Sequence, residues 1–142
     1  MIPITANLSK LITLQKRAIR IVGKTHYKSH TNPLFAQFKC LKFHDLVNLK
    51  ILLTVFQARH NKLPFNIQKL FVDHNQIHSF QTRSKAKSNY NMLHCRTKIK
   101  SKAISIYGVK LWNNLDKSVQ NVNSYVRFKK KVKNMLLSCY SN

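Results

Sequence analysis

Acidic side chains are almost missing from this chain. Of its 142 residues only 3 are acidic, all of them Asp, against 26 Lys and Arg, and the formal net charge is +23. The acids, Asp45, Asp73 and Asp116, are far apart in the sequence. Glycosidase-type acid/base catalysis and two-metal catalysis need carboxylates held close together, so both are disfavoured. Because self-repulsion at this charge opposes compaction, the composition predicts a polyanionic partner.

Glycine and proline are also scarce, with 2 and 3 residues, which disfavours a β-sandwich or a glycine-rich phosphate loop. The three cysteines, Cys40, Cys95 and Cys139, are odd in number and widely spaced, which favours a reducing compartment over a disulfide framework. The sequence shows no secretory apolar core and no apolar run of about 18 residues. We therefore expect a nuclear or cytoplasmic protein that is neither secreted nor transmembrane.

The chain does have helical periodicity, and 44% of its residues are apolar, which is enough for one core. We therefore expect a single domain, residues 1–142. We expect N-terminal helices over about 9–60. The first spans Ser9 to Val22, with Ser9 as its cap and Gly23 as its left-handed C-terminal residue. The Asp45–Arg59 helix is apolar on most sides, which predicts the centre of the core. We expect Leu63-Pro64 to end it.

The C-terminal half gives weaker signals until its last helix. Residues 73–92 are predicted to be irregular and basic, and residues 93–139 to hold a hairpin or helix and the C-terminal helices. From Leu93 to Tyr107 a small β-hairpin and a helix both fit the pattern, which Gly108 interrupts. Ser124 caps the last helix, whose apolar stripe includes Phe128. The predicted fold class is mainly α, a small helical bundle with one short β-hairpin left open.

Basic side chains are the strongest functional feature. Lysines on the last helix can neutralise phosphates along one face, and Lys98, Lys100 and Lys102 can form a second row. The predicted nucleic-acid-binding residues are Arg17, Arg20, Arg83, Arg96, Lys98, Lys100, Lys102, Arg127, Lys129, Lys130, Lys131 and Lys133. With about six phosphates engaged, the slope of log K against log salt is near −5 on duplex. Base-specific binding is disfavoured because Lys outnumbers Arg.

Aromatic side chains offer a second kind of contact with nucleic acid. Tyr90, Tyr107 and Trp112 are candidates for stacking on bases. For Trp112 a place in the core is the stronger interpretation, since Leu111 and Leu115 lie close to it in the sequence.

Histidine spacing raises the question of a metal. His26 with His30, and His74 with His78, have the i, i+4 spacing that can bind zinc on a helix. Both pairs lie in polar segments, and structural zinc sites usually need four close ligands. His94-Cys95 is a weaker third candidate. We expect surface histidines, no metal site, no cofactor and no catalytic residues.

Six phrases of the sequence, in order, resemble one known family. They are Leu14–Val22 (LQKRAIRIV), Thr31–Phe35 (TNPLF), Leu63-Pro64, Ile77–Arg83 (IHSFQTR), the Arg96 to Leu115 region with its WNNL, and Phe128–Lys133 (FKKKVK). Together these are similar to the C-terminal, post-polymerase region of jockey-like non-LTR (LINE-type) retrotransposon reverse transcriptases. The resemblance covers nearly the whole chain, from about Leu14 to Leu137.

The resemblance implies a tail that holds RNA or DNA beside an RNA-directed DNA polymerase. The Asp-Asp turn that carries the polymerase metals is absent from this sequence, so no enzymatic activity is expected. Val109 and Asp116 replace two prolines of the family. These departures suggest a 5′-truncated element copy that begins at Met1, whether retained for binding or inert. The expected partners are RNA or DNA, through phosphates, and the rest of a reverse transcriptase; no membrane is expected.

Two other functions stay open. A stand-alone DNA-binding regulatory protein is one, because the short helix from Pro33 followed by the Asp45 helix loosely resembles a helix-turn-helix. The second of these helices is, however, too apolar for a recognition helix. A cationic protein of the membrane surface is the other, since the first and last helices are both amphipathic and basic.

Overall fold

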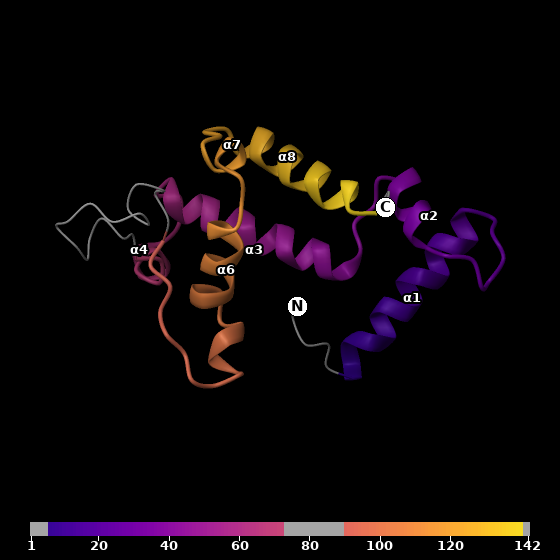
Figure 1. Cartoon of the computed structure of the whole chain (residues 1–142), viewed down its shortest axis with the longest axis horizontal. Coiled ribbons are helices and arrows are strands. Elements are labelled where there is room, and N and C mark those ends of the chain that lie inside the picture. Colours follow the sequence, from indigo (N-terminus) through magenta and orange to yellow (C-terminus); the bar gives the residue numbers. More distant parts are fainter. Residues whose placement is uncertain (1–5, 73–89, 141–142) are drawn as a thin grey trace. The chain divides into compact units, whose positions relative to one another are not determined.

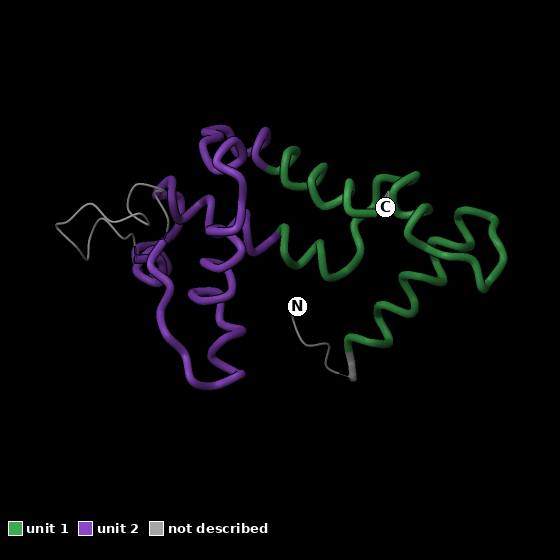
Figure 2. Tube along the Cα trace, in the orientation of Figure 1, with its two compact units in different colours: residues 1–49, 129–142 green, residues 50–128 purple. Residues whose placement is uncertain are grey.

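The computed structural model describes residues 6–72 and 90–140, and this part of the chain is helical without a β-strand (Figure 1). The elements are α1 (Ala6–Val22), α2 (Asn32–Gln37), α3 (Phe43–Arg59), α4 (Phe65–Gln68), the 3-10 turn η2 (Lys100–Lys102), α6 (Ile104–Asn113), α7 (Lys117–Gln120) and α8 (Tyr125–Ser138). The expected mainly α fold is confirmed. Residues 1–49 with 129–142 form one compact unit and residues 50–128 another (Figure 2).

The end of α1 differs from the prediction in how it uses its glycine. The helix begins at Ala6, so Ser9 lies inside its first turns and is not its cap. Gly23 does not have a positive φ; the left-handed residue is Lys24, at φ 47°. Close packing explains the glycine instead, because a Cβ at Gly23 would lie 3.0 Å from Leu34 Cδ2. Gly23 therefore lets the ends of α1 and α2 approach each other.

The C-terminus is fixed to the start of α3 by one tyrosine. Tyr140 is 5% exposed, and its hydroxyl donates to the Asp45 carboxylate and accepts from the backbone N–H of Lys42 at 3.1 Å. Its ring meets Phe35 edge-on, with centroids 6.3 Å apart, and the Lys42 ammonium lies 4.2 Å from the ring centroid. Four contacts thus hold Tyr140, two residues after α8, within the first unit.

Stacked aromatic rings form the core of the second unit. Phe56 and Phe128 stack with centroids 4.4 Å apart, and Trp112 lies 5.6 Å from Phe128. All three side chains are 0% exposed, which confirms both the central place of the α3 residues and the anchoring place of Trp112. Gln120, itself buried, donates to the Trp112 carbonyl at 2.7 Å and so satisfies the C-terminal end of α6.

Helix α3 ends at Arg59, as expected, but Leu63-Pro64 is not what ends it. Asn61 has φ 54°, and its N–H donates to the Ala58 carbonyl at 3.1 Å. The N–H of Lys62 donates to the Gln57 carbonyl at 2.9 Å, so the last turn closes on itself. This pattern, a left-handed Asn after the last turn, is a common way to end a helix. Pro64 therefore comes after a helix end that is already formed at Asn61.

The hairpin left open over 93–107 is absent. Residues 100–102 form η2, and α6 begins at Ile104. Gly108 does not break a pattern but lies inside α6, where a Cβ would be 3.1 Å from both Ile51 Cγ2 and Val55 Cγ2. Gly108 therefore lets α6 approach α3 closely. Of the predicted irregular segment, residues 73–89 lie outside the described part.

Candidate nucleic-acid interface

The basic row of α8 lies opposite the helix's buried face. Phe128 and Val132 are 0% exposed and mark the inner side. At about 100° per residue, Lys130 points away from the midpoint of that pair, with Arg127 and Lys133 on either side. The exposed cations of the helix are Arg127, Lys129, Lys130 and Lys131, and Lys133 is half-buried. The row carries five positive charges and no carboxylate.

The dimensions of this row suit a phosphate backbone. Six residues separate Arg127 from Lys133, a rise of about 9 Å along the axis. Phosphates of one strand of B-DNA follow at about 3.4 Å along its axis, so the row spans two to three of them. Because the side chains are long and mostly exposed, they can adjust to strands of different geometry.

Lys39 lies in a groove beside the α8 row, a position that the sequence did not predict. The groove has a volume of 540 Å³, and Lys39, Lys130 and Lys133 line it together with uncharged residues. Lys39 follows α2 in a left-handed conformation, φ 50°, and its N–H donates to the Ala36 carbonyl at 3.1 Å. In the sequence Lys39 is one lysine after a short apolar helix, a signal too weak to link it with α8.

The predicted row at 98–102 does not form as a row. Lys98, Lys100 and Lys102 are all exposed, but the last two lie in the 3-10 turn. In such a turn, residues two apart point about 120° away from each other, whereas in a strand they point the same way. Thr97 stabilises the turn, its hydroxyl accepting from the Lys100 N–H at 3.3 Å. Arg96 is exposed just before it, and Arg83 lies outside the described residues.

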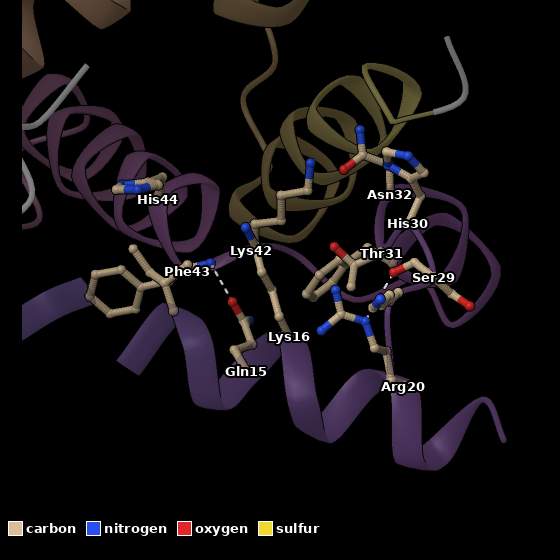
Figure 3. Close-up of a pocket in the computed structure, with 13 residues that line it drawn as sticks. Gln15, Lys16, Arg20, Ser29, His30, Thr31, Asn32, Lys42, Phe43 and His44 are labelled. Atoms are coloured by element: carbon tan, nitrogen blue, oxygen red, sulfur yellow. Dashed lines mark hydrogen bonds between the residues drawn. The ribbon is translucent and has the colours of Figure 1, made fainter. Parts of the chain in front are cut away.

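The two predicted arginines of α1 have different surroundings. Arg17 is exposed, whereas Arg20 is half-buried and its Nε donates to the Ser29 carbonyl at 2.9 Å. Arg20 thereby joins α1 to the loop that precedes α2, on the side of a cleft of 470 Å³ (Figure 3). In Figure 3 the side chains of Lys16 and Arg20 rise from α1 toward this loop and toward the start of α3.

Gln15, which lines the cleft, joins α1 to the start of α3. The side-chain nitrogen of Gln15 donates to the Leu41 carbonyl at 2.9 Å, and its oxygen accepts from the Phe43 N–H at 2.9 Å. These two bonds fix α1 against the start of α3. The charged and titratable residues that line the cleft are Lys16, Arg20, Lys28, Lys42, His30 and His44. Among residues 6–72 and 90–140, no carboxylate lines it.

The aromatic candidates for base stacking are mostly inside the fold. Trp112 is 0% exposed and Tyr90 is 5% exposed, so neither can receive a base. Tyr90 instead joins α6, where Asn113 donates to its carbonyl at 2.9 Å and accepts from its N–H at 3.1 Å. Stacking by Tyr90 was therefore a wrong expectation, whereas the core position of Trp112 is confirmed. Tyr107 is half-buried in α6.

The histidine pairs do not build a metal centre in the described part of the chain, where no three His, Cys or acidic residues cluster. His26 and His30 are exposed residues of the loop between α1 and α2, which is not a helix. His74 and His78 lie outside the described residues, and His94-Cys95 stands in an irregular stretch.

One other histidine has a perturbed environment. The His60 ring packs on Phe56 with centroids 4.3 Å apart. Desolvation, followed by repulsion from Lys62 and Arg59, lowers the pKa of His60 below its ordinary range.

The lengths of the described helices and the likeness of the chain to known proteins give no further indication of function. Within the described ranges, every helix is too short or too polar to cross a bilayer. Comparison of the chain with family models, with curated proteins and with solved structures finds no significant match.

Proposed function

We propose that this protein is a non-catalytic nucleic-acid-binding protein that contacts RNA or DNA through phosphates with little dependence on sequence. The basic row of α8 carries the proposal. It offers five cations on one helix, four of them exposed, against a buried apolar face and without a neighbouring acid on the helix. Each phosphate contact releases condensed counterions, which supplies binding free energy for any base sequence.

The origin that we propose is the C-terminal tail of a retrotransposon reverse transcriptase of the jockey-like type. The support is the six phrases in register, several of which coincide with structural elements. LQKRAIRIV forms most of α1, TNPLF contains the start of α2, and FKKKVK lies in α8. The genomic surroundings test this origin. Polymerase-palm sequence directly upstream, in frame or broken by stop codons, would support it, and an unrelated upstream region would contradict it.

The binding proposal is tested by fluorescence anisotropy with labelled single-stranded RNA, single-stranded DNA and duplex across a salt series. The variant is K129Q/K130Q/K131Q, which removes three charges from the α8 row. The matched control, K10Q/K50Q/K110Q, removes three charges from exposed lysines elsewhere. Circular dichroism verifies that each protein keeps its helices.

Loss of three phosphate contacts should reduce the steepness of the duplex salt slope by about 2.7. The control should change the slope by much less, and two unrelated base sequences should bind with similar affinity. Equal slopes for the α8 variant and the control would contradict the α8 row as the interface. No binding at low salt would overturn the function itself.

A second candidate, a membrane-surface protein, has one specific observation in its favour. Apolar side chains on one side of α1 are exposed: Leu11 44%, Leu14 59%, Ile21 76% and Val22 62%. Lys10 and Arg17 lie beside this stripe on the helical wheel, an arrangement found in interfacial helices. Sedimentation with anionic and neutral vesicles decides. Vesicle binding without nucleic-acid binding would favour this candidate over the first.

A further inference from the structure

The cleft between α1, the residues that lead into α2 and the start of α3 has a concentration of positive charge, and its described lining includes no carboxylate. Four cations line it: Lys16, Arg20, Lys28 and Lys42. A concave surface with one sign of charge focuses the field and draws in counter-ions. The site is therefore complementary to an anion.

Two of these cations have their positions set by the fold. Arg20 is anchored through Nε to the Ser29 carbonyl at 2.9 Å, a neutral partner that leaves its charge unbalanced. Figure 3 shows its guanidinium below Thr31, a residue that is 7% exposed. The Lys42 ammonium lies 4.2 Å from the centroid of the Tyr140 ring, and its backbone N–H donates to the Tyr140 hydroxyl at 3.1 Å. Donors that are already oriented lose little entropy when an anion binds.

The shape of the cleft favours the end of a nucleic-acid strand over an internal stretch of that strand. The α8 row is a convex helix surface, along which a backbone can run. The cleft is bounded by α1, by the residues that lead into α2 and by the start of α3 (Figure 3). Its 470 Å³ is within the usual range of small-molecule sites. The half-buried side chains of Ile12 and Phe43 add apolar lining, which suits a nucleoside next to the charged group.

We propose that this cleft binds a terminal phosphate of a nucleic-acid strand, that is, a phosphate monoester with its nucleoside. A monoester carries about −1.5 to −2 charges at pH 7, as a phosphorylated side chain does, against −1 for a backbone diester. Four cations therefore attract the end of a nucleic-acid strand more strongly than an internal phosphate. The inference deepens the proposed function, because it rests on strand binding and adds recognition of the strand's end.

The test compares strands of one sequence that end in a 5′-phosphate, a 3′-phosphate or hydroxyls only, by anisotropy at about 0.15 M salt. The wild-type protein should bind one phosphorylated end at least about tenfold more tightly than the hydroxyl strand, the value of one charge-assisted hydrogen bond. K16Q/K28Q should abolish that preference. K10Q/K50Q, with the same loss of charge outside the cleft, should keep it.

The outcomes separate this inference from the proposed function. Equal binding of phosphorylated and hydroxyl strands, or a preference that persists in K16Q/K28Q, overturns the cleft as an end site while strand binding stands. If strands do not bind but uridine monophosphate does, in a way that K16Q/K28Q abolishes, the phosphate site stands for a free nucleotide and the proposed function fails.

Nuclear magnetic resonance gives a readout that needs no variant. Uridine monophosphate should shift the backbone amide signals of Thr31 and Phe43 and the Nε–H signal of Arg20. Shifts confined to α8 would overturn the inference.

Discussion

Tyr140→Phe isolates one hydroxyl group that joins the end of α8 to the start of α3. The substitution keeps the ring, and with it the edge contact to Phe35 and the contact with the Lys42 ammonium. It removes the hydrogen bond donated to Asp45 and the one accepted from the Lys42 N–H. The measured change should therefore report on these two bonds alone.

The expected loss is about 2 kcal/mol in the free energy of unfolding. Hydrogen bonds to charged groups contribute about 1.5–3 kcal/mol, and the lower half of that range applies because Asp45 is only half-buried and water can replace the hydroxyl. The unpaired Lys42 N–H adds to the loss. Urea unfolding followed by circular dichroism measures it, and the m-value should be unchanged.

Tyr27→Phe is the matched control, because Tyr27 is 68% exposed and water can reach its hydroxyl. It should change stability by less than about 0.5 kcal/mol. A loss below that value for Tyr140→Phe as well would refute the reasoning, since the hydroxyl would then contribute nothing beyond what water supplies.

The same hydroxyl predicts a pH dependence. Burial, reinforced by the hydrogen bond to Asp45, raises the pKa of Tyr140 above the ordinary tyrosine range. The folded state therefore keeps this proton while the unfolded chain loses it near pH 10, so its stabilisation is full below about pH 10 and falls as the pH rises further. Tyr140→Phe should show a smaller alkaline loss of stability than the wild-type protein. An identical alkaline profile for the two would contradict the assignment.

Three other predictions follow from charge and packing. Because the pKa of His60 is lowered in the fold, its contribution to the free energy of unfolding is full above about pH 6.5 and is lost as the pH falls below that value. Urea unfolding at several pH values should show that the stability of His60→Asn falls less at acid pH than that of the wild-type protein. Gly108→Val should destabilise the protein by about 3 kcal/mol, since even a Cβ lies 3.1 Å from two side chains of α3, and thermal unfolding measures this. Raising sodium chloride from about 0.02 to about 0.3 M should raise Tm, because screening weakens self-repulsion in a chain of charge +23; a falling Tm would contradict this.

Prediction of how basic side chains are arranged succeeded where a single helix contains all of them, while nucleic-acid binding by them stays a prediction. The α8 row is readable because Arg127 to Lys133 and the buried Phe128 and Val132 belong to one helical period. It failed for Lys39, whose place beside Lys130 depends on how α2 packs near α8 within the first unit. The cleft is a similar case, since Lys16, Lys28 and Lys42 come from three segments.

The fold divides in the same way. The sequence by itself determined the helical class, the buried centre of α3 and the anchoring Trp112, because these depend on local period and on apolar content. Only the tertiary structure decided why the two glycines are needed. The local sequence does not indicate that Leu34 lies about 3 Å from where a Cβ of Gly23 would be, or that Ile51 and Val55 lie as close to a Cβ of Gly108. Close contacts between elements, and the clefts that such contacts leave, depend on residues far apart in the chain, and no local pattern records them.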